Sequence, residues 1–194
     1  MSASRPAENN RRHLPGYEAF WFVIGGYQLA FGIFFIIYAY YKINNRNTFA
    51  QYQDILSHDL GLFNTLVLIS SSWFAAAAIK LFRKNILKTA QYFLLTAFVC
   101  GLVFSAIKFI EYHKTIVSGY TLLTNDFFTF YYLLTGLHLM HVWVGMCGLI
   151  IAYMFLRRNP LTTDGVLSVE CCVVFWHMVD YLWIIIFPIF YLLK

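Results

Sequence analysis

Charged residues are scarce in this chain of 194 residues: they make up 12% of the sequence, whereas hydrophobic residues make up 60%. Because an average soluble domain has about 25% charged residues, this composition excludes an ordinary soluble protein and is typical of a membrane protein. The formal net charge of +5 does not indicate nucleic-acid binding. The basic residues cluster in short connections between apolar runs, where positive charge sets the orientation of membrane spans.

Motifs that would bind zinc or redox metals through cysteine are also missing. The four cysteines form neither a CxxC motif nor a His-spaced zinc pattern, and all of them fall in apolar segments: Cys100, Cys147, Cys171 and Cys172. We interpret them as reduced, packed thiols. The N-terminal stretch has no apolar run that a signal peptidase could follow, so residues 1–18 are predicted to form a polar tail that is retained.

Long apolar runs, by contrast, fill most of the chain. Each run reaches the roughly 20 residues that a helix needs to span a bilayer. The predicted spans cover residues 19–41, 62–82, 90–110, 127–156 and 171–193. The connections are too short for a soluble domain, so we predict an all-α polytopic membrane protein with one five-helix domain over residues 19–194.

The distribution of basic residues predicts the orientation of the bundle. Nine of the fourteen Lys and Arg residues fall on the side of the N-terminus: Arg5, Arg11, Arg12, Lys80, Arg83, Lys84, Lys88, Arg157 and Arg158. The positive-inside rule therefore predicts a cytoplasmic N-terminus and, with five spans, a periplasmic C-terminus in the inner (cell) membrane of a bacterium.

Ionisable residues inside the spans are few, and each needs a partner or a function. The fourth span contains His138 and His141, and the fifth contains Glu170, His177 and Asp180 at spacings of seven and three, which place them on one helical stripe. Two tryptophans, Trp176 and Trp183, flank this second stripe. We expect the two polar stripes to face each other.

Two interpretations of these stripes differ in function. In one, His138, His141, His177 and Asp180 bind a metal or haem, as in a small membrane oxidoreductase. In the other, these side chains and Glu170 form a structural network that ties the fourth span to the fifth. We favour the network, because di-metal bundles use repeated ExxH motifs and this chain has none.

A further charged pair ends the third span. Lys108 and Glu111 are three residues apart and are expected to pair at the membrane surface. The alternative is a proton-accessible carboxylate at Glu111 with a pKa tuned by burial. We expect Lys108, Glu111, Trp176 and Trp183 to contact lipid or a partner subunit.

The motifs GLHxxHVxxG, which starts at Gly136, and E(x)5WHxVDxxW, which starts at Glu170, resemble subunit III of the haem-copper oxidases. The stretches FVIGGYQLAFGIFFIIYAYY and GLVFSAIKFIEYHK extend the likeness over most of the chain. The chain resembles the shorter, five-helix form of the family. In overall texture it is most similar to the accessory members found with nitric oxide reductases.

This resemblance implies an accessory subunit without haem, copper or other cofactor, which packs against the catalytic subunit and phospholipid in a respiratory electron-transport complex. The haem and the copper or iron would belong to that partner, and this chain would not be catalytic on its own. Its role would be to stabilise the partner, support proton uptake and hold lipids. Dioxygen or nitric oxide as acceptor, and cytochrome c or quinol as donor, stay open. Many members carry an acidic residue near the position of Tyr27, and this chain does not.

Overall fold

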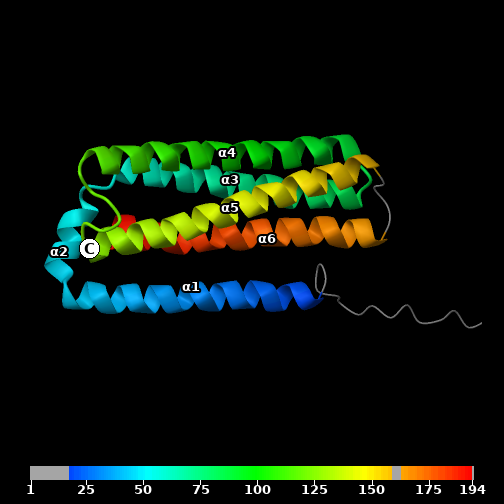
Figure 1. Cartoon of the computed structure of the whole chain (residues 1–194). Helices are drawn as coiled ribbons and strands as arrows, with labels where there is room; N and C mark the ends of the chain where they lie inside the picture. Colours follow the sequence, from blue (N-terminus) through cyan, green and yellow to red (C-terminus); the bar gives the residue numbers. More distant parts are fainter. Residues whose placement is uncertain (1–17, 159–162, 194) are drawn as a thin grey trace, which may run out of the picture.

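The computed structural model describes residues 18–158 and 163–193, so most of the predicted tail 1–18 lies outside the described residues. All regular structure in the described ranges is helical (Figure 1). The helices are α1 (Glu18–Asn44), α2 (Arg46–Gln53), α3 (His58–Arg83), α4 (Leu87–Val117), α5 (Asp126–Arg158), α6 (Thr163–Phe187) and the short π-helix η1 (Pro188–Leu192).

The predicted fold class is confirmed, because α1, α3, α4, α5 and α6 are long and apolar enough to cross a membrane. The predicted ends of these helices were less accurate. Starts expected at residues 62, 90 and 171 lie instead at His58, Leu87 and Thr163. The helices continue beyond their apolar runs because a polar turn at a membrane surface still completes its backbone hydrogen bonds as helix. The helix α2 was not expected, since its sequence is short and polar.

Four helices form the core of the bundle, and α1 lies beside it (Figure 1). The antiparallel pair α3 and α4 packs on the pair α5 and α6, whereas α1 makes fewer contacts, with α5 and α6. In the most apolar window of each span, 56% of α6 is buried but only 11% of α1. The helix α6 is therefore the central element of the fold, and α1 is available to lipid or to a partner.

Local sequence explains how the hairpins turn. Asn85, between α3 and α4, has a φ of 60°, in the left-handed region where asparagine is one of the few tolerated non-glycine residues. At the start of α5, the Asn125 side-chain oxygen accepts a hydrogen bond of 3.0 Å from the Phe128 N–H. This N-cap satisfies one of the free N–H groups at a helix start.

Pro188 marks the end of regular α-helix in the last span. Proline has no N–H to donate to the preceding turn, and the chain continues as the π-helix η1. Backbone carbonyls of this segment accept hydrogen bonds from elsewhere: Ile189 O from Tyr38 Oη and from Gln53 Nε2, and Leu193 O from Lys42 Nζ. Side chains of α1 and α2 thus hold the end of the chain.

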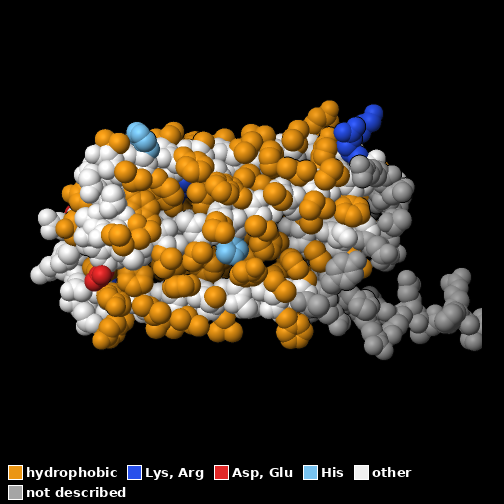
Figure 2. All heavy atoms as spheres, viewed as in Figure 1, with side chains coloured by type: hydrophobic (Ala, Val, Ile, Leu, Met, Phe, Trp, Pro, Cys, Tyr) orange, Lys and Arg blue, Asp and Glu red, His pale blue; other side chains and the backbone are white. Residues whose placement is uncertain are grey.

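Hydrophobic side chains cover the face of the bundle in view (Figure 2). The Lys and Arg side chains on this face gather mainly at the end of the bundle shown on the right, where α3 turns into α4. This distribution is typical of a helical bundle whose sides contact hydrocarbon and whose ends contact water.

Candidate functional site

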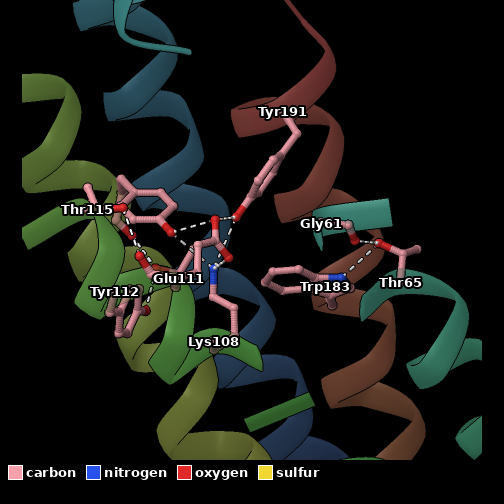
Figure 3. Close-up of polar contacts among 10 residues, drawn as sticks. Gly61, Thr65, Lys108, Glu111, Tyr112, Thr115, Trp183 and Tyr191 are labelled. Carbon is pink, nitrogen blue, oxygen red and sulfur yellow. Dashed lines mark hydrogen bonds and ion pairs between the residues drawn. The ribbon is translucent and has the colours of Figure 1, made fainter. Parts of the chain in front are cut away.

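The interior contains an ion pair with two tyrosines, which we call the Lys108 cluster: Lys108, Glu111, Tyr131 and Tyr191. Figure 3 shows Lys108, Glu111 and Tyr191 pointing toward one another. Lys108 Nζ donates to Glu111 Oε2 at 3.0 Å, to Tyr131 Oη at 3.2 Å and to Tyr191 Oη at 3.1 Å. Both tyrosine hydroxyls donate to Glu111 Oε1, that of Tyr131 at 2.9 Å. The three N–H groups of the ammonium therefore each have an acceptor, and both carboxylate oxygens are bonded.

Aromatic rings surround the Lys108 ammonium as well. Its Nζ lies 5.0 Å from the ring centroid of Tyr131, 5.2 Å from those of Tyr112 and Trp183, and 5.7 Å from that of Tyr191. These distances are within the range in which a cation is attracted to the face of a ring. Because the rings come from α4, α5, α6 and η1, the ammonium holds four elements together.

Glu111 also borders a small cavity at the end of α4. The cavity has a volume of about 70 Å³ and is lined in addition by Ile55, Ser57, Lys114, Thr115 and Ser118. A water molecule takes about 30 Å³ in the liquid, so the cavity has room for one or two. The cluster is thus buried, yet one of its members lies next to a space that water can enter.

The expected surface position of this pair does not match the structure. The spacing of three residues does give an ion pair, but Lys108 is 0% and Glu111 2% exposed. Trp176 and Trp183 are also fully buried, so none of the four side chains is exposed on the surface of this chain. The physical reason is that Tyr131 and Tyr191 supply the polar partners that water would supply at a surface.

Both tryptophans of α6 donate to hydroxyl groups of α3. Trp183 Nε1 bonds Thr65 Oγ1, and Trp176 Nε1 bonds Ser71 Oγ, each at 3.0 Å. Ser71 in turn donates to the backbone oxygen of Ala97 in α4 at 2.9 Å. Sequence analysis did not identify these hydroxyls as partners, because Thr65 and Ser71 are six residues apart and their spacing does not mark them as one helical stripe.

At the opposite end of the bundle, Glu170 pairs with Arg83. The Glu170 Oε1 atom accepts hydrogen bonds from Arg83 Nη2 at 2.7 Å and from Nε at 3.2 Å. The Arg83 side chain is 60% exposed, whereas that of Glu170 is 8% exposed. This ion pair joins the end of α3 to α6 where the bundle meets water.

His177 and Asp180 face α3 as well. The Oγ of Ser72 and the Nδ1 of His177 are 2.6 Å apart. Asp180 is buried, and its carboxyl oxygens make no hydrogen bond of ordinary geometry with the described residues. The Ser72 hydroxyl lies beside this carboxyl.

His138 and His141 lie apart from this group. His138 is fully buried, its ring nitrogens have no hydrogen bond with the described residues, and its ring lies 5.2 Å from that of Trp183 and 5.6 Å from that of Phe104. His141 Nδ1 donates to the backbone oxygen of Leu137 at 2.7 Å, within its own helix.

The expected network between the fourth and fifth spans is therefore not the one that the structure contains. Glu170 and His177 bond to α3, and neither His138 nor His141 bonds to His177 or Asp180 among the described residues. The stripe on α6 turns toward α3 because α6 packs between α3 and α5, and sequence periodicity alone does not tell which neighbour a stripe will face.

A metal centre is not formed by these side chains in the described part of the chain. No three His, Cys, Asp or Glu residues there lie close enough together to hold a metal ion. The alternative in which His138, His141 and His177 act as a ligand set therefore finds no matching geometry.

An apolar groove lies between α1, α5 and α6. Its volume is about 550 Å³, and its walls are aromatic, aliphatic and cysteine side chains, including Phe20, Val144 and Phe175. His141 is one of its few polar lining residues. The centroids of the His141 and Tyr27 rings lie 4.9 Å apart in an edge-to-face arrangement. The volume falls within the range of about 300–1,000 Å³ typical of small-molecule sites.

Five apolar spans, a buried ion pair toward one end, a partly exposed ion pair at the other end and an open apolar groove define a multi-pass membrane protein. The family model for cytochrome c oxidase subunit III matches residues 22–194 of the chain. The chain therefore belongs to the cytochrome c oxidase subunit III family, whose members are subunits of haem-copper oxidases in respiratory electron transport.

Named relatives agree with this family. The cytochrome c oxidase subunit 3 of Alkalihalophilus pseudofirmus is 27% identical, over 99% of this chain and 95% of its own length. The cytochrome bo(3) ubiquinol oxidase subunit 3 of Buchnera aphidicola from Schizaphis graminum is 26% identical, over 84% and 86%. The heme-copper oxidase subunit I+III of Aeropyrum pernix is 28% identical over 92% of this chain, which spans 24% of that longer protein.

Proposed function

We propose that this chain is the non-catalytic subunit III of a dioxygen-reducing respiratory oxidase in a bacterial inner membrane, where it stabilises the catalytic subunit. The family match over residues 22–194 is the main support. The named relatives are subunits of cytochrome c and ubiquinol oxidases, which favours dioxygen over nitric oxide as the acceptor. The nitric oxide reductase type, suggested by overall texture, has less support than the oxidase type.

Purification of the native complex tests this proposal. We expect the chain to co-purify with a catalytic subunit that carries haem and copper, because the described residues offer no ligand set of their own. An absorption spectrum of the separated chain should have no Soret band, while that of the catalytic subunit should have one. A Soret band that follows this chain would favour the small membrane oxidoreductase instead.

Proton uptake forms the second part of the proposed role, and the two ends of the bundle contribute differently. If the N-terminus is cytoplasmic, as the basic residues predict, the pair of Arg83 and Glu170 lies at the cytoplasmic end and the Lys108 cluster lies toward the periplasm (Figure 1). Protons taken up from the cytoplasm would first reach the end of the bundle that contains Glu170. We therefore infer that Glu170, not Glu111, is the carboxylate placed to support uptake.

The third part of the role is lipid binding in the groove between α1, α5 and α6. Its walls are almost entirely apolar, and it opens on the side of a bundle whose surface is hydrophobic. An acyl chain meets both conditions, because apolar surface in such a groove is best covered by another apolar group.

Filling the groove should displace lipid. Val144 is exposed within it, so Val144→Trp should reduce the number of phospholipids retained per purified complex. Leu102→Trp adds the same ring at an exposed position of α4 outside the groove and should leave the number unchanged. Mass spectrometry of extracted lipid measures both. Equal lipid content in the two variants would contradict the assignment of the groove.

A further inference from the structure

His177 is a half-buried imidazole in the middle of a predicted membrane span. It lies near the centre of the span Gly165–Leu192, and its partner Ser72 lies near the centre of His58–Arg83. The Nδ1 atom interacts with Ser72, but Nε2 makes no hydrogen bond with the described residues. A polar atom left exposed to hydrocarbon is costly, and ionisable side chains in spans almost always pair or face other protein.

The arrangement of hydrogen bonds around Ser72 determines whether His177 Nε2 is a donor or an acceptor. If Nδ1–H donates to Ser72, the serine hydroxyl is free to donate to the neighbouring Asp180 carboxyl, which otherwise has no hydrogen bond. The opposite arrangement leaves an ionised carboxyl without a donor, but a protonated carboxyl can donate to the serine oxygen itself. In either arrangement Nε2 of the neutral imidazole is left with one unmade hydrogen bond, as an acceptor when Nδ1 carries the proton and as a donor when it does not.

The surface around His177 is open and apolar. We call it the α3–α6 face and define it by Leu62, Ile69, Ser72, His177, Tyr181 and Ile184. Tyr181 is 54% exposed and Ile184 46%, and spacings of four and three place both on the same side of α6 as His177. Leu62 and Ile69 continue this surface on α3, and both are about half exposed. Small residues such as Ser72 let another helix approach closely in a membrane.

We propose that the α3–α6 face docks against a transmembrane helix of the catalytic subunit, which forms a hydrogen bond with His177 Nε2. This inference rests on the proposed function. The relative from Aeropyrum pernix is named as a fusion of subunits I and III, so the two subunits are joined in one chain there. A lipid tail could cover the apolar residues but offers no hydrogen-bonding group at the middle of the bilayer, whereas a protein helix offers both.

Site-specific photo-crosslinking in the assembled complex tests the location. A benzophenone amino acid replaces Tyr181 on the α3–α6 face or, as the matched control, Tyr92 on α4, which is 70% exposed. We expect an adduct with the catalytic subunit from position 181 and none from position 92. An adduct from position 92 alone, or from neither position in an intact complex, would overturn the docking face but not the proposed function. Failure of any catalytic subunit to co-purify would instead contradict the proposed function.

Substitution of His177 tests the hydrogen bond. His177→Phe keeps a ring but removes the hydrogen-bonding nitrogens, and an interhelical hydrogen bond in a membrane changes affinity by about threefold on average. The chain should therefore dissociate from the detergent-solubilised complex about threefold more readily. His177→Gln should restore part of the retention, because its amide group can accept or donate. Thr96→Val on α4 removes a hydroxyl that bonds its own helix and should change nothing. Equal retention of His177→Phe and the native chain would refute the hydrogen bond.

Discussion

Glu111→Leu should strongly destabilise the bundle. It leaves the fully buried Lys108 ammonium without its counter-charge, and it removes the acceptor of the Tyr131 and Tyr191 hydroxyls. Breaking a buried ion pair on one side costs about 3–5 kcal/mol, because an uncompensated charge stays in the interior. The free energy of unfolding in detergent micelles should fall by that amount.

A double variant distinguishes the cost of leaving one charge unpaired from the cost of removing the whole ion pair. Lys108→Met with Glu111→Gln removes both charges, keeps similar volumes and retains an oxygen that can accept from the tyrosines. Because replacing a whole buried pair is often close to neutral, this variant should lie within about 1–2 kcal/mol of the native chain. If Glu111→Leu alone were equally mild, water would have to reach the cluster freely, and the buried position of Lys108 would be refuted.

The spans could be predicted from the sequence because hydropathy and length are local properties. The partners of polar residues could not, because they come from distant parts of the chain. The spacing of Lys108 and Glu111 indicates a pair, but its burial depends on Tyr131 and Tyr191, which are 23 and 83 residues away from Lys108. A tyrosine near the C-terminus has no local feature that marks it as a partner.

Asp180 and His177 illustrate the same limit on another helix. Their spacing correctly indicates one polar stripe, but a stripe on the most buried helix can face any of several neighbours. The structure turns this stripe toward Ser72 on α3 instead of toward His138 on α5. Sequence analysis did not single out the serines of α3, whose hydroxyls are the partners of Trp176 and His177.

Trp176 fills a slot between two glycines. A Cβ atom at Gly145 of α5 would lie 2.7 Å from Cε3 of its six-membered ring, and one at Gly101 of α4 would lie 2.9 Å from Cη2 of the same ring. Favourable carbon contacts are about 3.5–4.0 Å long, so neither position has room for a methyl group. The hydrogen bond from Nε1 to Ser71 fixes the ring from a third helix. The ring therefore cannot shift away from a new side chain without losing that bond.

Gly145→Ala should consequently destabilise the chain, although alanine is the better helix former. The helix gains about 0.5–1 kcal/mol from the substitution. Overpacking costs about 1–3 kcal/mol, and displacement of Trp176 from Ser71 adds about 1 kcal/mol, so the net loss should be about 1–3 kcal/mol. Gly136→Ala in the same helix is the matched control, since a Cβ there meets no atom within 4 Å. Thermal unfolding of the purified complex should show a lower midpoint for Gly145→Ala and an equal or higher one for Gly136→Ala. Equal midpoints for the two variants would mean that Trp176 can move away from a new methyl group. The close packing of Trp176 against Gly145 and Gly101 would then be refuted.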